Sequence, residues 1–253
     1  MAELNARAFR TVTPIVALDV ADDRSAQGLV ERLGDSCDYY KVGLELFTAS
    51  GPTIVDWLRA RNKRVFVDLK LHDIPNTVRG AARRVAARGA SLLTVHASGG
   101  IEMVSAAVQG ALEGSDEHGA ASSDACGILG VSILTSLDGA SVGAAWGRPP
   151  VDIQSEVLRL AADVAEAQAA GLVCSGHEAE GVHRAFGSRL GLLIPGIRLA
   201  GGDAHDQRRV MTPKQAASAG ARWIVLGRAV TGAPDPVMAM RQVLDALTHA
   251  DTV

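Results

Sequence analysis

Residues 64–78 read RVFVDLKLHDIPNTV, an apolar strand that runs into a helix start and carries charges at the junction. Asp73 and Pro75 follow the strand, and a proline after an acidic residue is typical of a first helical turn. Successive side chains of a strand point to opposite faces. One face therefore holds Arg64, Phe66, Asp68 and Lys70, and the other holds Val65, Val67 and Leu69. The segment predicts a strand that brings the acidic side chain of Asp68 and the basic side chain of Lys70 together at its carboxyl end.

The composition narrows the possible functions. The chain has 253 residues, of which 47% are hydrophobic, enough for one large core. Its formal net charge is -3 and no basic block occurs, so we expect neither nucleic acid nor an anionic membrane as a partner. An anionic ligand would need a local binding site.

The cysteines and the N-terminal residues indicate a cytoplasmic protein. Cys37, Cys126 and Cys174 are widely separated and form no CxxC pair, which favours a reducing compartment and gives no case for structural zinc. Residues 1–20 lack the apolar core of a signal peptide. No stretch approaches the ~18 apolar residues of a membrane span.

Strand-like and helix-like segments alternate along the whole chain. Apolar runs predict strands at residues 15–20, 39–44, from 64, 92–97, 127–134, 171–175, 191–197 and 223–227. Helical spacing predicts helices at residues 25–33, 49–60, from 75, 98–112, 152–170, 178–186, 212–219 and 236–247. Residues 113–124 are polar and are expected to form a loop.

Eight such units in one chain of this length predict an α/β fold, a (β/α)₈ TIM barrel forming a single domain over residues 1–253. The alternative is a doubly wound open sheet. That fold usually has a glycine fingerprint after its first strand, whereas here the first strand ends at Asp19.

The carboxyl ends of the strands form the active-site face of such a barrel, so polar residues there are the candidates. They are Asp19, Lys41, Asp68, Lys70, His96, Thr135, Arg198, Gly227 and Arg228. Each has a plainer interpretation. Asp68 and Lys70 could be a solvated ion pair, Asp73 a helix cap, and His96 a core histidine.

The last two loops favour a phosphate site. Phosphate groups in these barrels commonly bind at the loops after strands seven and eight, and the guanidinium of Arg228 matches phosphate oxygens. The loop 198–210 offers hinge candidates at Gly201 and Gly202 and indicates a lid. Its possible phosphate donors are Gln207, Arg208 and Arg209. A plain surface loop is the alternative.

Ordered motifs spanning the chain resemble the orotidine 5′-phosphate decarboxylase family. They are ALD ending at Asp19, YYKVGLELF around Lys41, VFVDLKLHDIPNTV, TVHASGG, ILTS at residues 133–136, VCSGHEA, PGIR at residues 195–198, GDAHDQRRVMTP and VLGRAVT. The resemblance implies a cofactor-free and metal-free enzyme of pyrimidine biosynthesis that converts orotidine monophosphate to uridine monophosphate and CO₂.

The resemblance also implies residue roles. Lys41, Asp68, Lys70 and Asp73 would form an alternating charge network, with Asp73 and Thr77 reaching the other subunit of a homodimer. Lys70 would donate the proton. Asp19 and Lys41 would contact the ribose, Thr135 the pyrimidine, and Arg198, Gln207, Gly227 and Arg228 the phosphate side.

The residue types suit this chemistry. Loss of CO₂ leaves a carbanion without the usual delocalisation, and a fixed cation beside it is the direct remedy. Carboxylates beside Lys70 favour its protonated form, which suits an acid and disfavours a Schiff base. Asp68 would press against the departing carboxylate.

Two rival functions remain. Metal-dependent sugar-phosphate decarboxylases or aldolases share the DxKxxD pattern but have a glutamate two residues before its first aspartate. Phe66 stands there instead, and its ring cannot ligate a hard cation. A non-catalytic nucleotide-binding protein is the second rival, which the retained lysine and aspartates disfavour.

Overall fold

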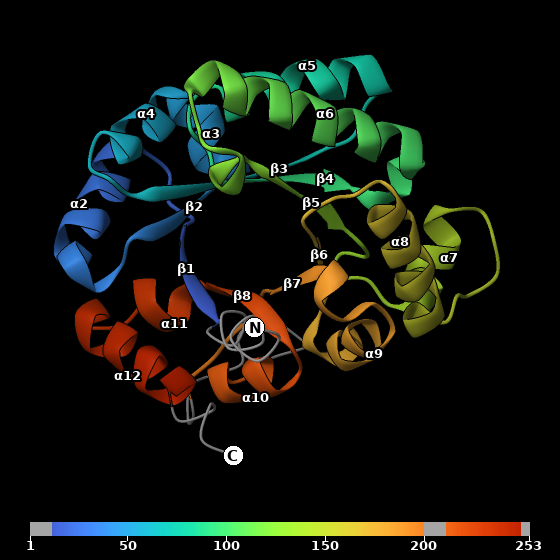
Figure 1. Ribbon diagram of the computed structural model, residues 1–253. Helices are drawn as coiled ribbons and strands as arrows, with labels where there is room; N and C mark the ends of the chain where they lie inside the picture. The colour runs from blue at the N-terminus through green and yellow to red at the C-terminus, as the bar shows by residue number, and fades with distance from the viewer. Residues whose placement is uncertain (1–11, 200–210, 249–253) are drawn as a thin grey trace, which may run out of the picture.

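Eight parallel strands close into a barrel in the computed structural model, which describes residues 12–199 and 211–248 (Figure 1). The strands are β1 (Thr13–Leu18), β2 (Tyr39–Gly43), β3 (Arg64–Leu71), β4 (Leu92–His96), β5 (Gly127–Val131), β6 (Gly171–Val173), β7 (Gly191–Ile194) and β8 (Ala221–Leu226). Each pairs with its sequence neighbour, and β8 closes the ring on β1. This confirms the predicted barrel. Several strands are shorter at their carboxyl ends than expected, because apolar residues there turn into the loops that line the cavity.

Helices surround the barrel (Figure 1). They are α2 (Asp23–Leu33), α3 (Leu44–Ser50), α4 (Thr53–Arg59), α5 (Pro75–Ala86), α6 (Gly100–His118), α7 (Gly139–Ala145), α8 (Ile153–Glu166), α9 (Gly176–Phe186), α10 (Pro213–Ser218), α11 (Arg228–Thr231) and α12 (Pro236–Thr248). Short 3₁₀ turns occupy Gly34–Ser36, Ala97–Gly99, Ser122–Asp124 and Gly187–Arg189. Among the described residues, no helix is both long enough and apolar enough to cross a bilayer.

One helix prediction and part of one loop prediction were wrong. The helix predicted over residues 49–60 is two helices, because Gly51 adopts a φ of 63° and Pro52 follows it, which ends α3 before α4 begins. The loop predicted over residues 113–124 begins only after His118, because residues 113–118 are the last part of α6. Glu113 and Glu117 there pair with Arg79 and Arg83 of α5, so helix-to-helix ion pairs extend a segment that looked too polar.

The core has two layers. Inside the barrel, inward-facing side chains such as Tyr39, Phe66 and Trp223 fill the space between the strands. Outside it, Val65 and Val67 belong to the larger cluster between the strands and the helices. Most side chains on both faces of the strands are therefore apolar, and Asp68 and Lys70 introduce charges toward the carboxyl end of β3.

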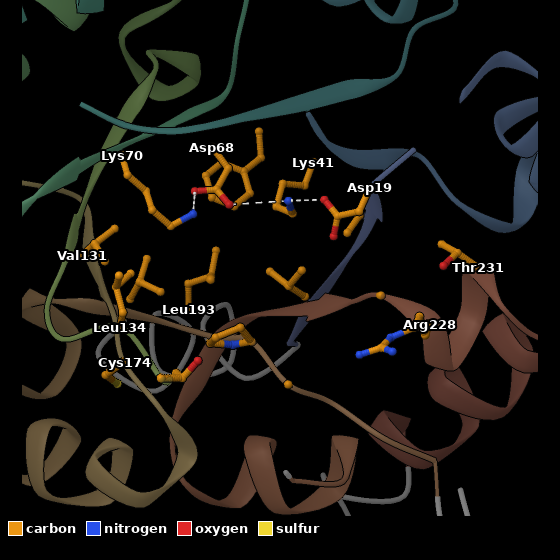
Figure 2. Close-up of a pocket in the computed structure, with 18 of the residues that line it drawn as sticks. Asp19, Lys41, Asp68, Lys70, Val131, Leu134, Cys174, Leu193, Arg228 and Thr231 are labelled. Carbon is orange, nitrogen blue, oxygen red and sulfur yellow. Dashed lines mark hydrogen bonds and ion pairs between the residues drawn. The ribbon is translucent and has the colours of Figure 1, made fainter. Parts of the chain in front are cut away.

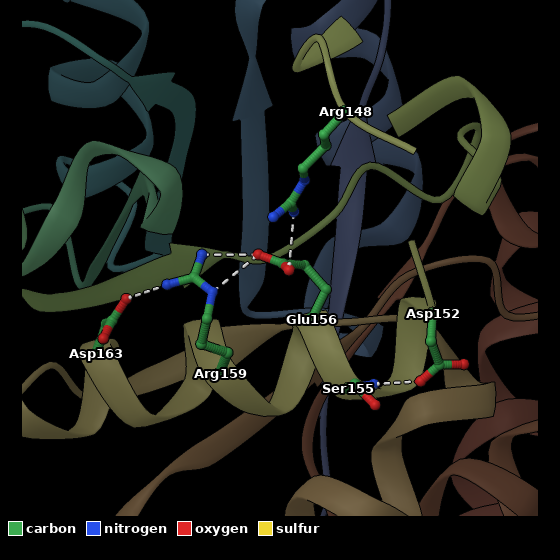
Figure 3. A network of polar contacts seen from close by, with 6 residues as sticks. All are labelled: Arg148, Asp152, Ser155, Glu156, Arg159 and Asp163. Atoms are coloured by element: carbon green, nitrogen blue, oxygen red, sulfur yellow. Dashed lines mark hydrogen bonds and ion pairs between the residues drawn. The ribbon is translucent and has the colours of Figure 1, made fainter. Parts of the chain in front are cut away.

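A polar network secures the long connection from β5 to α8 (Figure 3). Glu156 on α8 is 8% exposed and accepts from Arg148 Nη2 at 2.9 Å and from Arg159 Nη2 at 2.7 Å. Asp152 caps the same helix by accepting from Ser155 N at 2.8 Å. Because Arg148 lies in the connection and Glu156 in the helix, the pair ties the connection to the barrel wall.

Candidate active site

A cavity of about 410 Å³ opens at the carboxyl ends of the strands, as the barrel predicts. It brings together these predicted site residues: Asp19, Lys41, Asp68, Lys70, Thr135, Arg198, Gly227 and Arg228. They come from six separate segments of the chain and meet because parallel strands end on the same face. Gln207, Gly201, Gly202, Arg208 and Arg209 lie outside the described residues.

Four charges alternate in sign along one wall of the cavity (Figure 2). Lys41 Nζ lies 2.8 Å from Asp19 Oδ1 and 3.5 Å from Asp68 Oδ2. Lys70 Nζ lies 2.8 Å from Asp68 Oδ1. The two inner residues, Lys41 and Asp68, each have an opposite charge on both sides, which offsets the cost of removing their charges from water.

Gly43 makes room for this row and was not recognised from the sequence. A Cβ at that position would lie 2.9 Å from Lys41 Nζ and 3.1 Å from Asp19 Oδ1. Any side chain there would therefore push against the ion pair. A glycine that ends a strand beside a lysine was the available sequence signal.

Asp68 is held ionised by its neighbours. Burial opposes ionisation, but the charges of Lys41 and Lys70 and hydrogen bonds from Lys70 and Thr94 outweigh it, and the pKa of the Asp68 carboxyl is lowered. The side chain of Asp68 is 13% exposed and that of Lys70 is 30% exposed. Asp68 and Lys70 thus form an ion pair that faces the cavity and is largely shielded from solvent.

The backbone at Lys70 departs from a regular strand. Its φ is 51°, in the left-handed region that costs a non-glycine residue about 1–2 kcal/mol. The backbone N–H of Lys70 donates to Thr94 Oγ1 at 2.9 Å, which secures this conformation. Simple alternation predicted that Asp68 and Lys70 share a face. They do face the same cavity, but through this irregular turn of the chain.

Asp73 and Thr77 are exposed and do not line the cavity of their own chain. The interpretation of Asp73 as a helix cap does not hold, because the N-cap of α5 is Ile74 and has no side-chain cap. The Asp73 carboxylate instead accepts from the backbone N–H of Ile74 at 2.6 Å. Ile74 itself is 67% exposed. This turn therefore presents an acid and a large apolar side chain outward.

His96 fits its plainer interpretation. It is partly buried, packs against His72 with ring centroids 5.5 Å apart, and is not among the residues lining the cavity. Burial, followed by the charges of His72 and Lys70, lowers the pKa of His96. A neutral imidazole of this kind supports the wall of the site rather than facing a ligand.

Two arginines lie at the far end of the cavity from Lys70. Figure 2 shows Arg228 and Thr231 beyond β8, with the charged row between them and Lys70. Arg198 is 8% exposed, and burial and the charge of Arg228 lower the pKa of its guanidinium. Its Nε is buried and has no hydrogen-bond partner among the described residues. An anion bound between these arginines would relieve their mutual repulsion.

The remaining walls are apolar. They include Val131, Leu134 and Leu193, which lie across the cavity from the charged row in Figure 2, and Cys174 at the end of β6. Burial raises the pKa of the Cys174 thiol, so this cysteine is unreactive. No group of three or more His, Cys, Asp or Glu side chains in the described part of the chain is placed to share a metal ion. The site therefore offers one charged wall and one apolar wall, which suits a flat, polar-edged ring.

Comparison with known proteins identifies the family. A sequence model described as "Orotidine 5'-phosphate decarboxylase / HUMPS family" matches residues 13–243. Orotidine 5′-phosphate decarboxylase of Moorella thermoacetica is 44% identical over 90% of this chain and 89% of its own length. That of Anaeromyxobacter sp. strain K is 46% identical over 91% of this chain and 96% of its own length.

Solved structures agree with the sequence relatives. The crystal structure of orotidine 5′-phosphate decarboxylase from Lactobacillus acidophilus matches with a TM-score of 0.81 and 32% identity, covering 94% of this chain and 99% of that one. These matches confirm the resemblance seen in the motifs. The chain therefore belongs to the orotidine 5′-phosphate decarboxylase / HUMPS family.

Proposed function

We propose that this protein is a cytoplasmic, cofactor-free orotidine 5′-phosphate decarboxylase that forms uridine 5′-monophosphate and CO₂. The observation that carries the proposal is the row Asp19–Lys41–Asp68–Lys70 along one wall of the cavity. The row ends on an ammonium that faces an apolar wall, where a ring could lie flat. Family membership supports the same reaction.

Lys70 supplies the chemistry in this proposal. The bond between C6 and the carboxylate breaks, its electron pair stays on C6, and CO₂ leaves. The Lys70 ammonium stabilises the developing carbanion and then donates its proton to C6, and the neutral amine regains a proton from solvent. Asp68 forms an ion pair with the Lys70 ammonium and places a negative charge close to the carboxylate that departs.

The other cavity residues bind the rest of the nucleotide. Asp19 and Lys41 contact the ribose, and Thr135 contacts the pyrimidine. Arg198, Gly227 and Arg228 hold the phosphate, with Gln207 from the loop beyond the described residues. The separation of Arg228 from Lys70 in Figure 2 supports this division, because the phosphate would bind far from the reacting carbon.

Asp73 and Thr77 complete the site of a second subunit. Both are exposed in their own chain, beside the exposed side chain of Ile74. A homodimer that buries this turn would bring the Asp73 carboxylate next to the partner's Lys70. The network of four charges that includes Asp73 would then be assembled only across the interface.

The competing function is a metal-dependent sugar-phosphate reaction. Phe66 lies on the inner face of β3 and lines the cavity where a carboxylate ligand would have to stand. The direct test follows the fall in ultraviolet absorbance of orotidine monophosphate on adding protein treated with a chelator. We expect full activity. A protein that needs a divalent metal ion, or that leaves orotidine monophosphate unchanged, would overturn the proposal.

Phosphate binding gives a prediction for Arg228. Arg228→Ala should raise KM for orotidine monophosphate about 10- to 100-fold, since a charge-assisted contact to phosphate is lost. With phosphate-free orotidine, the wild type should be slow and the variant equally slow. Arg222→Ala, at the opposite end of β8, is the matched control and should leave KM unchanged. If Arg228→Ala weakened the reaction of orotidine and of orotidine monophosphate by the same factor, Arg228 would not contact the phosphate.

A further inference from the structure

Thr94 occupies an unusual place in the barrel. On either side of it, Val67 pairs with Leu93 and Leu71 pairs with Val95, so the ladder between β3 and β4 shifts register in between. Residues 68–70 of β3 therefore stand opposite a single residue of β4. A backbone that bulges in this way leaves N–H groups without their ladder partners. Thr94 lies opposite this bulge and is itself fully buried.

The hydroxyl of Thr94 supplies hydrogen bonds to residues of the bulge, where the strand ladder is interrupted. Thr94 Oγ1 accepts from the Lys70 backbone N–H at 2.9 Å and donates to Asp68 Oδ1 at 2.9 Å. That same carboxylate oxygen accepts from Lys70 Nζ at 2.8 Å. One hydroxyl is thus bonded to both charged residues of the bulge, to the backbone of one and the side chain of the other.

We propose that Thr94 is a positioning residue for decarboxylation, which holds the Asp68–Lys70 pair in its working geometry. This inference rests on the proposed function. Thr94 is not among the residues lining the cavity, so it acts through its two partners and not on the substrate. Its hydroxyl secures the left-handed backbone of Lys70, which directs the ammonium, and fixes the carboxylate oxygen to which that ammonium binds.

Substitution of Thr94 tests whether this residue positions the Asp68–Lys70 pair or contributes to substrate binding. Thr94→Val keeps the shape but leaves the Lys70 N–H without this acceptor and Asp68 with one donor fewer. We expect kcat to fall about 10- to 100-fold, because small displacements of a reacting group have effects of this size. KM should change by less than about 3-fold, since the contacts to ribose and phosphate remain. Thr94→Ser retains the hydroxyl and should stay within about 3-fold of the wild-type kcat.

Ser115 provides a matched control for the loss of a buried hydroxyl. Its Oγ accepts from Cys126 N at 2.9 Å and donates to Ala111 O at 2.8 Å, at the opposite end of the barrel from the cavity. Ser115→Ala should lower Tm to a similar extent as Thr94→Val without changing kcat. If Thr94→Val does not fold, Thr94→Ala replaces it and has to show the same loss of kcat.

The outcomes separate this inference from the proposed function. If the wild-type protein does not decarboxylate orotidine monophosphate, the proposed function fails. If the wild type is active and removal of the Thr94 hydroxyl leaves kcat within about 3-fold, the positioning role alone is wrong. The role is equally wrong if Thr94→Ser is as slow as Thr94→Val, or if the loss appears in KM and not in kcat.

Discussion

Lys70→Ala should lower kcat by about 10⁴-fold or more. In the proposed mechanism the variant loses both the cation that stabilises the carbanion and the proton donor, and each of these contributes at least about 10²-fold in comparable enzymes. The fold should survive, because the Lys70 side chain is partly exposed and packs into no core cluster. Steady-state decay of the absorbance of orotidine monophosphate measures kcat, and circular dichroism verifies the fold.

Lys63→Ala is the control for the loss of a lysine. Lys63 precedes β3 at the opposite end of the barrel and donates to Gly34 O at 2.8 Å and to Cys37 O at 2.9 Å. Its loss should reduce stability and leave kcat unchanged. A Lys70→Ala protein that retains more than about one hundredth of the wild-type rate would contradict the assignment of Lys70.

Mixing two inactive variants should restore activity. Asp73→Ala alone should lower kcat at least about 10²-fold, because a charge of the network is missing. In a heterodimer of Asp73→Ala and Lys70→Ala chains, one site combines an intact Lys70 with the intact Asp73 of the partner subunit. Random reassortment of equal amounts should therefore recover roughly a quarter of the wild-type activity.

The outcome of that mixture depends on whether Asp73 acts in its own barrel or in the barrel of the partner subunit. If Asp73 served its own barrel, each site would carry one defect or the other in every pairing. No mixture would then exceed the activity of the separate variants. Size-exclusion chromatography verifies that the mixture is dimeric, and a different affinity tag on each variant verifies that the chains have reassorted into heterodimers.

The barrel was predictable because its signals are local and repeated. Apolar runs separated by helical patterns indicate a parallel sheet covered by helices. Eight such strand–helix units are the number that forms a closed barrel. The gathering of Asp19, Lys41, Asp68 and Lys70 followed from the same rule, since strand ends share one face. What each of these residues does came from the resemblance of motifs, and it stays a prediction.

Other features depend on contacts between distant residues. The extension of α6 needs Arg79 and Arg83 of another helix, which no local pattern contains. The left-handed backbone of Lys70 and its bond to Thr94 arise from a shift between two strands, whereas period-two alternation assumes a regular strand. Gly43 matters for the space it leaves, which becomes visible once Lys41 and Asp19 are in place.

Lys70→Cys followed by aminoethylation tests the role of the Lys70 ammonium most directly. The natural cysteines Cys37, Cys126 and Cys174 are buried, and burial raises the pKa of each thiol, so the reagent should modify the new thiol selectively. Wild-type protein treated in the same way is the control and should keep its activity.

We predict that Lys70→Cys is inactive, that aminoethylation restores at least about one hundredth of the wild-type kcat by returning an ammonium to this position, and that alkylation with a neutral group restores nothing. Activity in the unmodified Lys70→Cys protein, or equal recovery with the neutral group, would contradict the account.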